Sequence, residues 1–267
     1  MEENKILVTQ LTDEQRRIYD DVLDDVINKA GGLYFVYGYG GTGKTFLWRA
    51  LSSALRSKGD IVLNVASSGI ASLLLPGGQT ALFRFAIPIS INEDSTCNIN
   101  VGSSLTMRDL MHAKNPNSYM TFGGKTVVFG GDFRQILPVI PKGTRQDIVG
   151  ASINSSYLWR SCKVYRLTKN LRLRCLESNT QVHEIEEFAK WIANIGDGEI
   201  GNSTEGYSDL NIPDHLLLRF NDDPIGIIVD STFPGFLNGN HELSCLKNIA
   251  ILAPTLDVVD QVNEYMN

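Results

Sequence analysis

Hydrophobic positions along the chain fall into two patterns, short apolar runs and longer amphipathic stretches. The apolar runs predict buried strands over residues 33–37, 61–66, 126–130, 163–167 and 249–254. The amphipathic stretches predict helices over residues 12–30, 46–57, 69–75, 183–198 and 255–265. The first of these begins at Thr12-Asp13-Glu14-Gln15, which has the form of a capping box. Strands that alternate with helices indicate an α/β fold with a mostly parallel sheet.

Composition narrows the class of protein. The chain has 267 residues, of which 43% are hydrophobic and 20% charged, as in folded globular proteins. It has no apolar run near the roughly 18–20 residues that span a bilayer, and its start lacks the apolar core of a secretory signal. Its 4 cysteines and 4 histidines are scattered, so neither disulfides nor structural zinc is expected. We expect a soluble intracellular protein, with a mobile loop over the Gly/Asn/Ser-rich residues 196–208.

Charge is unevenly distributed along the chain. Residues 101–182 carry 12 basic and 4 acidic side chains, whereas residues 183–267 carry 3 basic and 15 acidic ones. A basic middle segment is suited to contacts with nucleic-acid phosphates, but solvated charged faces explain the same counts equally well. Charge alone therefore does not distinguish a nucleic-acid-binding surface from solvated charged faces.

The strongest chemical signal is the sequence Gly38-Tyr39-Gly40-Gly41-Thr42-Gly43-Lys44-Thr45, which fits GxxxxGK[ST] between a predicted strand and a predicted helix. Glycines let the backbone curl so that several N–H groups face a phosphate, and the helix N-terminus adds its positive dipole. In this pattern Lys44 reaches the β- and γ-phosphates and the Thr45 hydroxyl binds Mg²⁺. The bound nucleotide is expected to be ATP.

Hydrolysis needs further acids on a neighbouring strand, to hold Mg²⁺ and to activate water. By pattern alone the only candidate is Asp132, which ends the apolar run VVFGGD and has no second acid after it. Asp132 is equally plausible as a turn residue.

Several blocks together resemble the petite-integration-frequency (Pif) family of superfamily 1 DNA helicases, most closely its plant and Helitron-transposon branch. The blocks are LTDEQRRIYD, GYGGTGKT, ASSGIASLLLPGGQTALFRFAIP, GGDFRQILPV, LTKNLRL, WIANIGDGEI and ILAPTLDVVDQVN. The resemblance implies a RecA-like ATP-binding domain over residues 1–160 and a truncated second RecA-like domain over residues 161–267.

The resemblance also implies roles for single residues. Gln15 would read adenine, although it is also plausible as a helix-cap residue. Asp132 and Gln135 would couple the γ-phosphate to the DNA site, which assigns Asp132 to the third motif and not to a metal strand. Arg172 would meet the γ-phosphate as an arginine finger. Four aromatic residues, Phe83, Phe85, Phe133 and Tyr157, either stack on bases or, as we expect more often, belong to the core.

The sequence departs from the family's pattern near residues 100–125. The family has an apolar strand ending in Asp-Glu there, and this chain runs from Leu105 to Thr106 without one. Leu82 and Phe83 also stand where related sequences have His and Ser, and the family's last two motifs are not found before Asn267.

The implied function is ATP-driven translocation along single-stranded DNA with duplex unwinding, in DNA repair, recombination and telomere maintenance. The protein is expected to be monomeric, without a structural metal or a membrane association, in the nucleus, with a mitochondrion or plastid as alternatives. Two other functions stay open: an ATP- and DNA-binding remnant that does not hydrolyse ATP, and an unrelated small-molecule kinase with a similar phosphate loop.

Overall fold

The computed structural model describes residues 2–85, 120–135, 138, 140–171, 179–204, 207–219, 223–235, 249–253 and 255–266. The chain divides into two compact units, Met1–Ile200 and Gly201–Asn267. The expected Asp132 and Gln135 lie within the described residues. Arg172 and the junction at Leu105 and Thr106 lie outside them.

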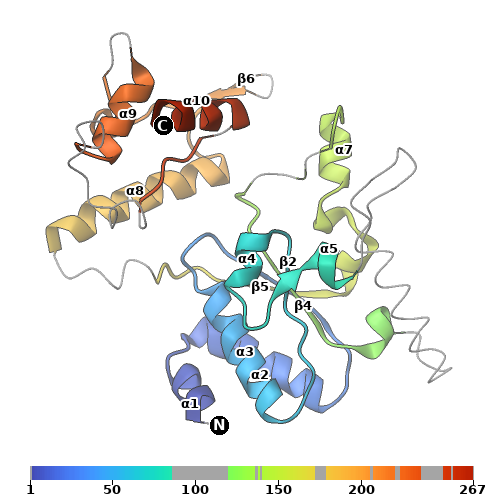
Figure 1. The fold of residues 1–267 in the computed structure, drawn as a ribbon. Coiled ribbons are helices and arrows are strands. Elements are labelled where there is room, and N and C mark those ends of the chain that lie inside the picture. The colour runs from blue at the N-terminus through green and yellow to red at the C-terminus, as the bar shows by residue number, and fades with distance from the viewer. Residues whose placement is uncertain are drawn as a thin grey trace. The chain divides into compact units, whose positions relative to one another are not determined.

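A parallel sheet of three strands lies at the centre of the first unit (Figure 1). Its strand order is β4 (Val127–Gly131), β1 (Leu33–Tyr37), β5 (Cys162–Arg166). In this register Tyr37, at the end of β1, is level with Gly131 on one side and Arg166 on the other. All three strands therefore end at the same edge of the sheet, which is where ligands bind in open α/β sheets.

One face of the sheet is covered by three helices, α1 (Glu2–Thr9), α2 (Asp13–Ile27) and α3 (Lys44–Ser57). Successive strand residues point to opposite faces, so Tyr34 and Val36 face the helices and pack in a core with Ile18 and Leu47. The capping box predicted at the start of α2 is present, because Thr12 accepts from the backbone of Gln15 and the Gln15 side chain accepts from Thr12.

The opposite face of the sheet has a smaller core of Leu33, Phe122 and Leu158. Phe122 and Leu158 belong to two short 3-10 helices that precede and follow β4. Further elements of the first unit are η1 (Thr121–Gly124), α7 (Arg145–Gly150), η2 (Ile153–Ser155), η3 (Tyr157–Ser161) and α8 (Asn179–Asp197).

A second, two-stranded sheet joins β2 (Val65–Ala66) to β3 (Gln79–Thr80) in parallel, with α4 (Gly69–Leu73) between them and α5 (Ala81–Arg84) after them. The strand predicted over 61–66 is therefore wrong for all but its last two residues. Within the described part of the chain no strand pairs with residues 61–63, and the Ile61 side chain is 90% exposed. An apolar run forms a buried strand only where a neighbouring strand covers it.

The second unit contains β6 (Asn202–Thr204), β7 (Tyr207–Asp209), η5 (Asp214–Leu216), α9 (Pro224–Thr232) and α10 (Leu256–Met266). β6 and β7 pair in antiparallel orientation within the stretch 196–208, where a mobile loop was expected. The mobility of this stretch stays a prediction. The last predicted strand is also wrong, because the described residues 249–253 contain no strand, whereas the predicted helix after it is present as α10.

The expected α/β fold with a mostly parallel sheet and flanking helices is confirmed in the first unit. β5, expected to open a second domain after residue 160, pairs with β1 in the first unit. The assignment of 161–267 to a partial second RecA-like domain stays a prediction. None of the helices in the described segments is long and apolar enough to cross a bilayer.

Candidate functional site

The phosphate loop joins the end of β1 to the first residue of α3, as the motif predicts. Gly41 and Gly43 have φ angles of 93° and 78°, a region that residues with a Cβ rarely adopt. A Cβ at Gly38 would lie 2.7 Å from Thr42 Oγ1 and 2.8 Å from the Leu167 carbonyl oxygen. Strained backbone and close approach therefore require glycine in this loop, which explains the sequence pattern physically.

Lys44 and Thr45 begin α3, so both lie at its N-terminus next to the loop. The Lys44 ammonium donates to the Gly38 carbonyl and, at 3.2 Å, to the Tyr39 carbonyl. Thr45 is exposed. The N-terminus of α3, the Lys44 ammonium and Thr45 thus lie in one small region, which is suited to a phosphate and its metal ion.

Gln15 supports the loop from α2 and is only 1% exposed. Its Nε2 donates to the carbonyl oxygens of Thr42 at 3.2 Å and Gly43 at 3.3 Å, and its Oε1 accepts from the Thr12 backbone at 3.0 Å. Both amide hydrogens are therefore used inside the protein. The adenine-reading role of Gln15 stays a prediction. The hydrogen bonds of its side chain show a structural role, in which it supports the phosphate loop.

The segment that follows β5 lies against the loop. The Leu171 backbone N–H donates to the Gly41 carbonyl at 2.9 Å, and the Tyr39 hydroxyl donates to the Thr168 carbonyl at 2.7 Å. Glu14 accepts from both the backbone and the hydroxyl of Thr168. Burial opposes ionisation of Glu14, but these hydrogen bonds and the charge of Lys169 outweigh it and lower the pKa of Glu14. Arg172, the next residue in the sequence, lies outside the described residues, and its role as an arginine finger stays a prediction.

Asp132 and Gln135 follow β4, directly beside the phosphate loop. The Gly38 N–H donates to the carbonyl of Gly131 at 3.3 Å, which fixes the end of β4 against the start of the loop. Asp132 Oδ1 accepts from the Arg134 backbone at 3.1 Å, and Oδ2 accepts from Gln135 Nε2 at 3.3 Å. The structure therefore brings Asp132 and Gln135 together. Within the described residues no three His, Cys, Asp or Glu side chains cluster closely enough to bind a metal ion.

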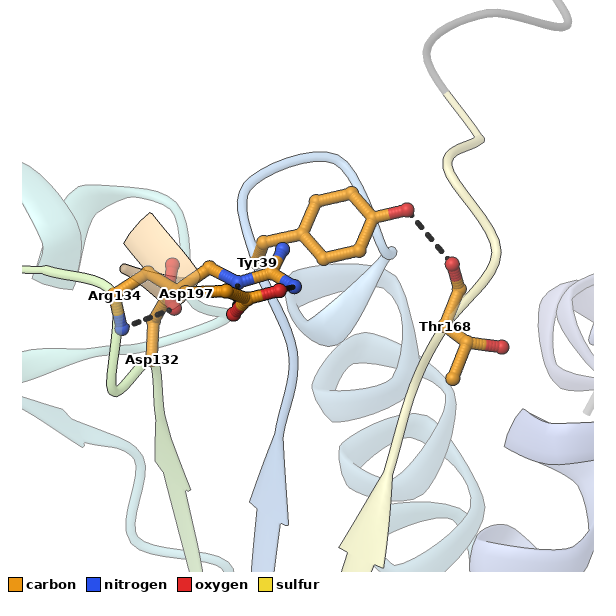
Figure 2. A network of polar contacts seen from close by, with 5 residues as sticks. All are labelled: Tyr39, Asp132, Arg134, Thr168 and Asp197. Carbon is orange, nitrogen blue, oxygen red and sulfur yellow. Dashed lines mark hydrogen bonds and ion pairs between the residues drawn. The ribbon is translucent and has the colours of Figure 1, made fainter. Parts of the chain in front are cut away.

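Sequence reasoning missed a polar cluster beside the loop, made of Tyr39, Arg134 and Asp197 (Figure 2). Arg134 donates from Nε and Nη2 to the two carboxylate oxygens of Asp197, at 2.6 and 2.5 Å. Its guanidinium carbon lies 4.8 Å from the centroid of the Tyr39 ring. The ion pair raises the pKa of Arg134 and lowers that of Asp197. Both charged residues lie in blocks of the family resemblance, but nothing in their spacing indicated that they pair.

The block ASSGIASLLLPGGQTALFRFAIP resembles the family's segment that touches single-stranded DNA. Its described residues form the end of β2, α4, β3 and α5, and their apolar side chains are largely exposed. Phe83 is 74% exposed, and Phe85, Phe133 and Tyr157 are about half exposed. The expectation that these four aromatics belong to the core is therefore wrong for this structure. Phe133 is an intermediate case, because it is 46% exposed while its ring centroid lies 5.4 Å from that of Phe35, 5.6 Å from that of Tyr37 and 6.1 Å from that of Trp159.

Comparison with known proteins decides the family. The family model described as PIF1-like helicase matches residues 10–107 and 104–206. The chain belongs to the PIF1-like helicase family. The ATP-dependent DNA helicase PIF4 of Trypanosoma brucei brucei is 25% identical over an alignment of 225 residues that covers 73% of this chain and 26% of that protein.

Solved PIF1-like helicases share the fold. A Bacteroides Pif1 helicase in complex with ADP-AlF3 and single-stranded DNA superposes with a TM-score of 0.51 and 21% identity, over 71% of this chain and 47% of that one. A structure of two coordinating Pif1 helicases at forked double-stranded DNA gives a TM-score of 0.51 and 22% identity, over 71% and 49%. This PIF1-like chain thus spans about a quarter of its curated relative and about half of these solved chains.

Proposed function

We propose that this chain is the ATP-binding part of a PIF1-like DNA helicase, which binds ATP with Mg²⁺ at the phosphate loop and single-stranded DNA nearby. The observation that carries the proposal is the set of elements around the loop. α2, the end of β4 and the segment after β5 each place residues of a helicase block beside residues 38–45. A small-molecule kinase has no need of the GGDFRQILPV and LTKNLRL blocks, so the family assignment disfavours that alternative.

The chain's own residues divide the binding of the nucleotide between them. Gly38, Gly40, Gly41, Thr42 and Gly43 supply the backbone that surrounds the phosphates, and Lys44 exchanges its two carbonyl acceptors for phosphate oxygens. The Thr45 hydroxyl is a metal ligand, and Mg²⁺ neutralises charge on the phosphates when bound. Gln135 and Asp132 respond to the γ-phosphate, and Arg172 adds a cation from the segment after Leu171.

We also propose that this chain, as its sequence stands, does not hydrolyse ATP efficiently. Two features support a missing strand with its Asp-Glu pair. The family model matches in two pieces that meet at residues 104–107, and residues 95–125 contain a single acid, Asp109. Among the described residues β4 lies at the edge of its sheet, and the side chains of Ile61 and Leu63 are exposed in an apolar run. An unpaired edge and an uncovered apolar run are both consistent with the loss of a neighbouring strand.

Single-stranded DNA is the proposed partner, and unwinding by the whole protein would serve DNA repair, recombination and telomere maintenance in the nucleus. The exposed aromatic and apolar side chains of α4 and α5 are suited to base stacking. The basic excess over residues 101–182 is suited to phosphate contacts. Binding of a fluorescent oligonucleotide should therefore weaken as salt rises, and an affinity that does not change with salt would contradict the electrostatic part.

The test of the nucleotide site is titration with fluorescent ATP. Lys44→Ala should weaken binding roughly 10- to 100-fold, because a charge-assisted contact is lost. Lys58→Ala, at the exposed far end of the same helix, removes an equal charge and should leave affinity unchanged. Equal affinities of wild type and Lys44→Ala would overturn the assignment of the loop.

The test of hydrolysis compares DNA-stimulated ATPase rates of this chain and of a version with an acidic strand inserted between Leu105 and Thr106. Removal of one well-placed electrostatic element costs roughly 10²–10³ in rate in other enzymes. The inserted strand should raise turnover by at least that factor. Comparable turnover of both proteins would contradict the proposal and would direct mutagenesis to Asp132 as the substitute ligand.

A further inference from the structure

The backbone carbonyl of Tyr39 accepts most of the internal hydrogen bonds described for the phosphate loop. Its carbonyl oxygen accepts from Thr42 Oγ1 at 2.9 Å, from the Thr42 N–H at 3.4 Å and from Lys44 Nζ at 3.2 Å. Three donors of the loop are thus arranged around one residue. Any contact that fixes Tyr39 also fixes the positions of Thr42 and Lys44.

The side chain of Tyr39 is held at two places (Figure 2). Its hydroxyl donates to the Thr168 carbonyl, and its ring lies beneath the Arg134 guanidinium. Arg134 is in turn held by the bidentate pair with Asp197, the last residue of α8. Its remaining group, Nη1, is buried without an acceptor among the described residues, so Asp197 is the anion that orients this guanidinium.

Gly196 makes this approach possible. A Cβ at Gly196 would lie 2.8 Å from Arg134 Cβ and 2.9 Å from its Cγ and Cδ. These are atoms at the base and middle of the side chain, which cannot swing away as a flexible tip can. The last turn of α8 therefore contacts the Arg134 stem only because residue 196 has no side chain.

We propose that Arg134 is a positioning residue for the phosphate loop, held by Asp197 across Gly196, and that ATP affinity depends on this contact with the end of α8. This proposal rests on the proposed nucleotide function. It adds that α8, which contributes none of the expected ligands of the nucleotide, sets how firmly the loop is held. The structural pathway is Asp197 to Arg134 to the Tyr39 ring, and from the Tyr39 carbonyl to Thr42 and Lys44.

The experiment measures hydrogen exchange of the loop amides without nucleotide, together with titration by fluorescent ATP. Arg134→Ala, Asp197→Ala and Gly196→Ala should each speed exchange over residues 38–43 and weaken ATP binding by roughly 3- to 30-fold. The double variant Arg134→Ala/Asp197→Ala should be no weaker than Arg134→Ala alone, because both changes break one interaction. Gly150→Ala in α7, where an added Cβ meets no atom within 4 Å, is the matched glycine control.

Gly196→Ala separates positioning from a merely structural role. Alanine favours a helix over glycine, so helix content should not fall, while loop exchange and ATP affinity change. Unchanged loop exchange or unchanged ATP affinity in Arg134→Ala overturns the proposal. If Lys44→Ala leaves ATP binding intact, the proposed nucleotide function fails, and the exchange measurement still decides whether Arg134 holds the loop.

Discussion

Replacement of Gln15 by leucine tests how strongly α2 supports the phosphate loop. Leucine fills a similar volume but removes the two bonds that Nε2 donates to Thr42 and Gly43 and the one that Oε1 accepts from Thr12. Each such bond contributes about 1 kcal/mol net, and partners left buried without a bond add to the loss. We expect the free energy of unfolding to fall by about 3 kcal/mol, which lowers Tm by roughly 6–12 °C.

Urea unfolding followed by circular dichroism measures this change. Gln10→Leu is the matched control, because Gln10 is exposed and its substitution should stay within about 0.5 kcal/mol. A loss below about 1 kcal/mol for Gln15→Leu would refute the reasoning, since it would mean that the buried amide bonds add no more than the leucine side chain gains by burial.

The isosteric change Gln15→Glu gives the same argument a pH dependence. It places a carboxyl oxygen where Nε2 faces the carbonyls of Thr42 and Gly43, so the protonated acid is favoured in the folded state and its pKa is raised. Stability is then highest below the unfolded-state pKa of about 4.3 and is lost as the pH rises. A variant whose stability does not depend on pH between 4 and 7 would contradict this.

Three further predictions concern other parts of the first unit. Gly43→Ala should abolish nucleotide binding and lower the stability more than Gly59→Ala. Both glycines have positive φ, but only a Cβ at residue 43 would lie close to other atoms. Equal melting temperatures of the two variants would refute a steric clash at residue 43. Hydrogen bonds, of which that from Lys163 has the largest effect, lower the pKa of Asp21. The stabilising effect of Asp21 is therefore present above about pH 4 and is lost as the pH falls. Asp21→Asn should reduce this loss of stability at acid pH, measured by urea unfolding over a pH series. Leu158→Ala should cost about 2–5 kcal/mol in the same assay, because this side chain is fully buried against the sheet.

Apolar runs correctly predicted those strands that pair with a neighbouring strand in the sheet. The strand over 33–37 is present as β1, and the strands over 126–130 and 163–167 are each displaced by one residue. Most of the apolar run over 61–66 does not form a strand, because a strand also needs a neighbouring strand with which to pair. A sequence window cannot report whether the neighbouring strand exists.

The same limit applies to the site. The phosphate loop could be predicted because its glycines, its lysine and its flanking elements are consecutive in the sequence. Gln15 was singled out, but its hydrogen bonds to the loop carbonyls were not, since they cross 27 and 28 residues. The Arg134–Asp197 pair crosses 63 residues, and an isolated arginine or aspartate carries no local signal of its partner.

The phosphate loop is held by residues that are distant along the chain, so during synthesis the loop is translated well before these residues. Tyr39 is 129 residues from Thr168, to which its hydroxyl donates. At about 5–20 residues per second, a ribosome needs roughly 6–26 s to add that stretch after the loop sequence has been translated. A nascent chain that ends before β5 therefore carries GYGGTGKT without the strand and segment that hold it. We therefore expect ATP to protect the finished chain from proteolysis but not such a ribosome-bound fragment.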